Sequence, residues 1–132
     1  MTIFEKIISD EIPSYKIAED DNYIAFLDAF PLKKGHTLVV PKEPVDYIFD
    51  LDDTSLSGLH IFSKKVAKAI EASIPCKRIG TAVIGLEVPH THIHLIPINE
   101  VGDINFSNPK LKIEANRMIE IAQGIASAFS SL

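Results

Sequence analysis

The chain has 132 residues, the size of one domain with a substantial hydrophobic core, so we expect residues 1–132 to form a single domain. Its composition is typical of a folded globular protein, and a formal net charge of −5 without a Lys/Arg run argues against a nucleic-acid surface. A single cysteine, Cys76, and the lack of an apolar run of about 18 residues argue against disulfides and membrane spans, so we expect a cytoplasmic protein.

Apolar spacing and turn residues predict the secondary structure in chain order. The predicted elements are a short helix at 3–8, strands at 14–18, 23–28 and 36–40, a long helix at about 54–73, strands at 78–84 and 91–98, and a final helix at about 111–129. Pro13, Pro41 and Pro75 each mark the end of an element. Three helices and about five strands, with a helix between groups of strands, predict an α+β fold with an antiparallel sheet.

Three histidines alternate with other residues in the segment His90-Thr91-His92-Ile93-His94. On a strand, residues two apart point to the same face, so the spacing predicts a column of three imidazoles on one face of the sheet. Clustered titratable groups mark functional sites more often than scaffolds. His60, alone in the long helix, is interpreted as a structural residue.

Two kinds of chemistry fit such a column. Neutral imidazoles are good zinc ligands, although the flanking segments add no cysteine and no carboxylate in register on the same face. Alternatively, an unperturbed imidazole with a pKa of about 6.5 is mostly neutral near pH 7 and can attack a phosphorus atom directly. The spacing alone leaves both interpretations open.

The segment from His90 to Ile96 resembles the His-φ-His-φ-His-φ-φ signature of the histidine-triad (HIT) superfamily, where φ is hydrophobic and Thr91 is a loose match. Residues 26–42 and 4–13 resemble two further landmarks of that family, in the right order along the chain. The resemblance covers nearly the whole chain. It implies a HIT-like fold, in which a five-stranded antiparallel sheet is accompanied by a short N-terminal helix, a long central helix and a C-terminal helix.

The resemblance also implies roles for individual residues. By position, His92 is the nucleophile that attacks the α-phosphate of a nucleotide, and the backbone carbonyl of His90 holds its other ring nitrogen. His94 donates to the phosphate oxygens, and His36 on the neighbouring strand completes the polar site. Asp28 matches the acidic residue that binds the ribose hydroxyls. The apolar slot for the base is expected to contain Ile3, Phe4, Ile7, Phe26 and Leu27.

The chain departs from the family pattern at several positions. Gly85-Leu86-Glu87 stands where many relatives have Gly-Gln-Ser/Thr, and Ile79 replaces an Asn or Gln, so the leaving group is expected to be handled differently. Glu87 would repel a phosphate if ionised, would donate a proton if its pKa were raised, or would point into solvent. Thr2 and Glu5 occupy the positions of zinc-binding cysteines in some relatives, so we expect no structural zinc, and no cofactor is implied.

The first hypothesis is therefore a phosphoramidase-like nucleotide hydrolase or transferase that forms a covalent nucleotidyl-His92. Its expected substrates are purine nucleoside phosphoramidates or related conjugates, with AMP or GMP as product. A dinucleoside polyphosphate hydrolase, a nucleotide-binding module with little turnover and a metal-binding domain are the alternatives. Resemblance also suggests a homodimer that pairs the long helix and extends the sheet.

Overall fold

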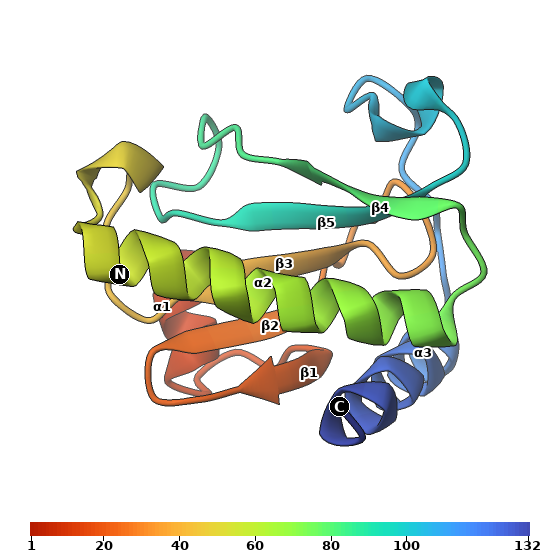
Figure 1. Cartoon of the computed structure of the whole chain (residues 1–132), viewed down its shortest axis with the longest axis horizontal. Coiled ribbons are helices and arrows are strands. Elements are labelled where there is room, and N and C mark those ends of the chain that lie inside the picture. The colour runs from red at the N-terminus through yellow and green to blue at the C-terminus, as the bar shows by residue number, and fades with distance from the viewer.

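A computed structural model describes all 132 residues of the protein. The elements in chain order are α1 (Ile3–Ile8), β1 (Lys16–Glu19), β2 (Tyr23–Leu27), β3 (Thr37–Pro41), the 3-10 turn η1 (Ile48–Asp50), α2 (Asp53–Ser73), β4 (Arg78–Ala82), β5 (Ile93–Ile98), the 3-10 turn η2 (Val101–Ile104) and α3 (Ala115–Ser130). The five strands form one antiparallel sheet in the order β1-β2-β3-β5-β4 (Figure 1). The predicted α+β class and five-stranded sheet are confirmed.

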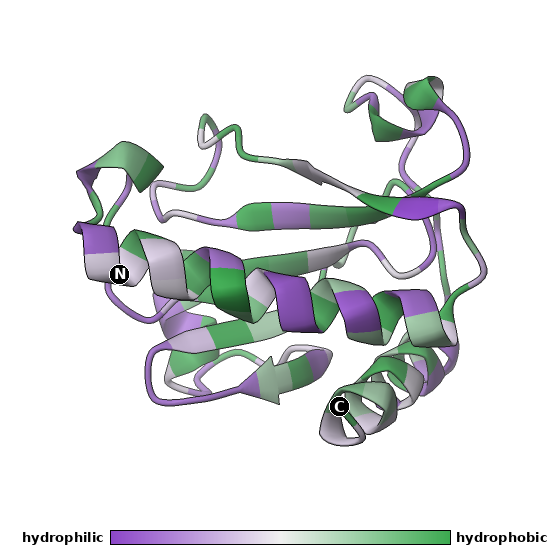
Figure 2. Ribbon diagram, in the orientation of Figure 1, coloured by the Kyte–Doolittle hydropathy of each residue, from purple (hydrophilic) through white to green (hydrophobic).

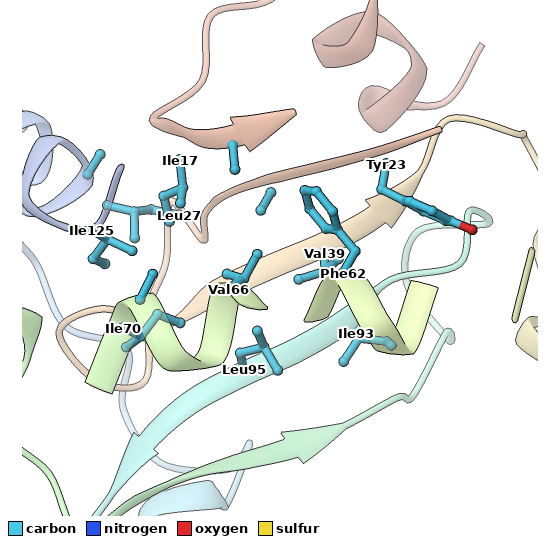
Figure 3. Packing of buried hydrophobic residues seen from close by; sticks show 14 of the residues in the cluster. Ile17, Tyr23, Leu27, Val39, Phe62, Val66, Ile70, Ile93, Leu95 and Ile125 are labelled. Atoms are coloured by element: carbon cyan, nitrogen blue, oxygen red, sulfur yellow. The ribbon is translucent and has the colours of Figure 1, made fainter. Parts of the chain in front are cut away.

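The two faces of the sheet carry two separate hydrophobic cores. The larger core joins α2 and α3 to one face, where Val39, Ile93 and Leu95 lie beneath Val66 and Ile70 of α2 (Figure 3). The smaller core lies on the other face, where α1 packs against alternate residues of β2 and β3. Because side chains alternate along a strand, neighbouring residues of β2, β3 and β5 serve different faces.

The long helix α2 is amphipathic, as the sequence predicts. Its N-cap is Asp52, whose carboxylate accepts a hydrogen bond of 2.7 Å from the Ser55 amide. Green and purple segments alternate along its ribbon (Figure 2), and the apolar side turns toward the sheet. None of the helices combines the length and apolar character that a membrane crossing needs.

Four predicted elements begin later than expected, namely the strands predicted from residues 14, 36 and 91 and the last helix. β5 starts at Ile93 instead of residue 91, because the amide and the hydroxyl of Thr91 both donate to the carbonyl of Val45, at 2.8 and 2.7 Å, and leave the sheet. The last helix starts at Ala115 instead of residue 111, and the segment before it is irregular, with the Leu111 amide donating to a carbonyl of the loop between β2 and β3.

A tight turn before β3 sets the position of the residue that follows it. Gly35 has φ of +93°, in the left-handed region that glycine adopts without strain. A Cβ atom at this position would lie 3.0 Å from Cγ1 of Ile74, so the turn has little room for a side chain. The turn therefore fixes the position of the next residue, His36, which is buried just before β3.

Candidate active site

A cleft of about 570 Å³ opens on the face of the sheet that α1 partly covers. Residues from α1, β2, β3 and β5 form it, together with the segments 84–88 and 106–110. It contains every predicted site residue except His90, namely Ile3, Phe4, Ile7, Phe26, Leu27, Asp28, His36, Glu87, His92 and His94. The residues that the sequence singles out from distant segments thus meet in one place.

The predicted column of three imidazoles on one strand is wrong. Only His94 belongs to β5, and His90 and His92 lie in the irregular segment before it. The rings of His92 and His94 are adjacent, with centroids 5.0 Å apart, and both line the cleft. The ring of His90 turns away and is fully buried, because its two nitrogens bond to other segments.

The tautomer of His92 follows from one hydrogen bond. Its Nδ1 lies 2.8 Å from the backbone oxygen of His90, and a carbonyl only accepts, so Nδ1 carries the proton. Nε2 of the neutral ring therefore keeps its lone pair. Burial lowers the pKa of His92, against the opposing effect of the bond to His90. Near neutral pH the ring is thus an uncharged nucleophile with a defined attacking atom.

A second chain of hydrogen bonds fixes the protons of His36 and His94. The backbone amide of Leu32 donates to Nδ1 of His36 at 3.0 Å, so the proton of His36 lies on Nε2. This Nε2–H donates to Nδ1 of His94 at 2.9 Å, which leaves the proton of His94 on its own Nε2. Burial lowers the pKa of His36 to about 3 and the pKa of His94 to about 4. His94 is therefore a neutral hydrogen-bond donor beside the nucleophile.

Asp28 lies just beyond the end of β2, at the side of the cleft. One oxygen of its carboxylate accepts from the Phe30 amide at 2.9 Å, and the other lies 3.6 Å from Nε2 of His36. Burial raises the pKa of Asp28, although the bond from Phe30 acts in the opposite direction. A carboxylate in this position is a suitable acceptor for the hydroxyl groups of a sugar.

Asp28, His36 and His94 are also close enough to hold a metal ion, since one potential ligand atom of each lies within 4.8 Å of the others. The hydrogen bonds do not favour this use. A metal ligand needs a lone pair, but the Leu32 amide places the proton of His36 on the nitrogen that faces Asp28 and His94. Metal binding here would require the bond between Leu32 and His36 to break.

The apolar part of the cleft differs from the predicted base slot at one residue. Phe4, Ile7 and Phe26 are buried together in the smaller core, and Ile3 lies at the mouth with 49% of its surface exposed. Leu27 borders the cleft, but it follows Phe26 on β2, so its side chain points to the opposite face and packs in the larger core (Figure 3). Adjacent residues of one strand cannot both face the same ligand.

Three residues of irregular segments also line the cleft, namely Phe106, Lys110 and the predicted Glu87. The ring of Phe106 packs edge-on against His94, with centroids 4.8 Å apart. Lys110 donates to the Phe106 carbonyl at 2.8 Å and is the only cationic side chain in the lining. Glu87 lines the cleft from the segment 84–88, and its side chain is exposed. Phe106 and Lys110 were not predicted from the sequence, because they lie in an irregular segment with no periodic pattern.

Comparison with known proteins agrees with this geometry. A family model, the HIT domain, matches residues 9–101, which is more than half of the chain. The chain therefore belongs to the histidine-triad (HIT) family.

Two relatives and one solved structure match nearly the full length. The chain is 34% identical over 127 residues to adenosine 5'-monophosphoramidase hnt1 of Schizosaccharomyces pombe, covering 95% of this chain and 96% of the yeast protein. It is 36% identical over 138 residues to an uncharacterized HIT-like protein of Borreliella burgdorferi, covering 94% and 95%. A Hit-like protein from Bartonella henselae has the same fold, with a TM-score of 0.85 and 33% identity over 96% of this chain and 95% of that chain. The name of the fission-yeast relative supports a nucleotide hydrolase at the level of the family.

Proposed function

We propose that the protein hydrolyses nucleoside phosphoramidates through a covalent nucleotidyl-His92 intermediate. The observation that carries this proposal is the hydrogen bond between Nδ1 of His92 and the His90 carbonyl, which leaves Nε2 with a lone pair in a cleft of nucleotide size. The name of the fission-yeast relative, an adenosine 5'-monophosphoramidase, supports the substrate class.

The reaction has two displacements at phosphorus. Nε2 of His92 attacks the α-phosphorus, the bond from phosphorus to the leaving nitrogen breaks, and that nitrogen takes up a proton from solvent and departs as an amine. The His92 ring is then positively charged, and the His90 carbonyl, which accepts from its Nδ1–H, stabilises that charge. Water next attacks the phosphorus and releases a proton to solvent, the bond to Nε2 breaks, and the nucleoside monophosphate leaves as the ring returns to its neutral state.

The other parts of the cleft fit the remaining parts of a nucleotide. The base occupies the apolar slot around Phe4, Ile7 and Phe26, and Asp28 accepts from the ribose hydroxyls. Nε2–H of His94 donates to a phosphoryl oxygen, and its neutral state is maintained by the bond from His36. A purine nucleotide substrate and an AMP or GMP product fit this arrangement.

The charges in the cleft favour phosphoramidates over dinucleoside polyphosphates. A chain of phosphates carries several negative charges, yet the lining offers one cation, Lys110, against the carboxylates of Asp28 and Glu87. An amine leaving group brings no further negative charge. The carboxylate of Glu87, which lines the cleft and is exposed, does not repel a neutral or cationic amine as it leaves.

The test is hydrolysis of an AMP phosphoramidate by wild type, His92→Asn and, as a control away from the cleft, Lys64→Asn on the exposed side of α2. We expect His92→Asn to lower kcat by at least roughly a thousandfold, because the nucleophile is lost, and Lys64→Asn to keep the wild-type rate. Equal rates for wild type and His92→Asn would refute the covalent mechanism. Binding of AMP by a wild type that cleaves no conjugate would instead identify a binding module.

We also propose that the protein is a cytoplasmic homodimer. β4 is a free edge of the sheet, and the apolar side chains of Val83, Ile84 and, on α2, Ile61 are 41%, 46% and 60% exposed. A second copy that extends the sheet at β4 would cover them. Sedimentation equilibrium of the purified protein tests the dimer, and a monomer at micromolar concentration would contradict it.

A further inference from the structure

The first helix begins with a capping box that reaches beyond the helix. The hydroxyl of Thr2 accepts from the Glu5 amide at 3.1 Å, and the Glu5 carboxylate accepts from the Thr2 amide at 2.9 Å. Such reciprocal bonds satisfy amides that the first turn leaves free. A hydroxyl that accepts one hydrogen bond still has its own proton to donate, so Thr2 has a donor left over.

That donor lies against the first histidine of the triad. Oγ1 of Thr2 is 3.2 Å from Nδ1 of His90, and Nε2 of His90 is 2.8 Å from the backbone oxygen of Pro41. Because the Pro41 carbonyl only accepts, Nε2 carries the proton and Nδ1 is an acceptor, so Thr2 is the donor. The fully buried His90 ring is thus held between α1 and β3 through both of its nitrogens.

The position of His90 matters because its carbonyl sets the tautomer of His92. His90 lies in an irregular segment, where no sheet hydrogen bonds fix its backbone. Phe4, two residues after Thr2, packs edge-on against His92, with ring centroids 4.9 Å apart. The N-terminal helix therefore contacts the nucleophile directly through Phe4 and indirectly through Thr2 and His90.

We propose that Thr2 is a positioning residue, whose hydroxyl proton holds the His90 ring so that the His90 carbonyl can orient His92 for attack. This inference rests on the proposed function of His92. The same helix carries Ile3, Phe4 and Ile7 of the apolar slot, so a nucleoside bound there packs on the element that fixes His90. A defect at Thr2 therefore appears mainly in kcat, since the atoms that bind the nucleotide remain in place.

Three substitutions separate the role in the helix cap from the role at His90. Ser, Asn and Asp cap helices about equally well, so Thr2→Ser, Thr2→Asn and Thr2→Asp all keep the bond from the Glu5 amide. Ser and Asn also have a proton to donate to Nδ1 of His90, whereas an ionised Asp only accepts. Asn and Asp have nearly the same shape. Glu5→Ala, which removes the other half of the capping box and leaves the Thr2 hydroxyl, measures the effect of a weaker cap alone.

Steady-state hydrolysis of an AMP phosphoramidate gives the first readout. We expect Thr2→Asp to lower kcat by roughly tenfold or more with little change in KM, and Thr2→Ser, Thr2→Asn and Glu5→Ala to stay within about threefold of wild type. Equal kcat for Thr2→Asn and Thr2→Asp would overturn the proposal. So would a loss in Glu5→Ala as large as that in Thr2→Asp, because the helix cap would then explain both.

The ring nitrogens give a second readout that needs no activity. In ¹⁵N NMR spectra of the imidazoles, wild type and Thr2→Asn should show His90 protonated at Nε2 only, and Thr2→Asp should show a changed Nδ1 signal. An unchanged His90 spectrum in Thr2→Asp would overturn the contact itself. The NMR spectra could show this contact while His92→Asn hydrolyses the conjugate as fast as wild type. That result would refute the proposed function of His92 but leave the hydrogen bond between Thr2 and His90 established.

Discussion

Acidification from pH 7 to pH 5 is expected to lower the free energy of unfolding by about 2 kcal/mol through His36 alone. The side chain is 1% exposed, and burial lowers its pKa from 6.5 to about 3. In the unfolded chain the ring takes up a proton below about pH 6.5, whereas in the folded protein it stays neutral to about pH 3. Between these values the unfolded state binds more protons, so stability is lost as the pH falls. The stability falls by about 1.4 kcal/mol for each pH unit below the pKa of the unfolded chain. Because pH 5 lies about 1.5 units below that pKa, the total loss is about 2 kcal/mol.

Urea unfolding of wild type, His36→Gln and His60→Gln at both pH values measures this contribution. Glutamine keeps a polar side chain at the site but does not titrate, so the stability difference between pH 7 and pH 5 should shrink by about 2 kcal/mol in His36→Gln. The exposed His60 is the matched control, and its variant should keep the wild-type difference. His94, whose pKa is lowered to about 4, acts in the same direction and remains in every variant. Equal acid sensitivity of wild type and His36→Gln would show that His36 is not held neutral by the fold.

Three further outcomes follow from particular contacts. Because burial lowers the pKa of His92, kcat/KM should stay constant from pH 8 down to about pH 6.5 and fall below it; a fall that begins above pH 7 contradicts a neutral nucleophile. Lys110→Met should weaken AMP binding roughly threefold to tenfold in calorimetry, while Lys112→Met outside the cleft should not, and equal effects of the two would contradict a local role. Gly58→Ala should lower the midpoint of urea unfolding, because the new methyl group would collide with the Tyr23 hydroxyl. This collision should outweigh the higher helix propensity of alanine, which is about 1 kcal/mol. A higher midpoint would mean that Tyr23 moves aside without cost.

The secondary structure could be predicted wherever local signals agree. The sequence places the long helix at about 54–73, and α2 runs from Asp53 to Ser73 after the N-cap Asp52. Here a capping residue, apolar positions at helical spacing and a following proline all indicate the same element. The class of the fold follows from several such segments, whereas the position of β5 between β3 and β4 was not predicted.

The geometry of the site could not be predicted in the same way, because it depends on contacts between distant residues. The hydroxyl of Thr91 leaves the sheet to reach a carbonyl 46 residues earlier, and this shortens β5. Thr2 meets His90 across 88 residues, and no spacing rule relates the two. Phe106 and Lys110 enter the cleft from a segment whose path is set by the bond between the Leu111 amide and Pro31.

The alternation of side chains on three strands separates stability from chemistry in this fold. Val39, Ile93 and Leu95 face the larger core, whereas Leu38 and His94, their neighbours in the chain, face the cleft. Substitutions on the first face therefore change the packing under α2, and substitutions on the second face change the surroundings of the nucleophile. A slip of one residue between β3 and β5 would exchange the two faces and place the His94 ring in the apolar core, where its nitrogens would lack partners. The buried bond between His36 and His94 forms only in the observed register, so the contact that sets the proton of His94 also opposes the wrong pairing of these strands.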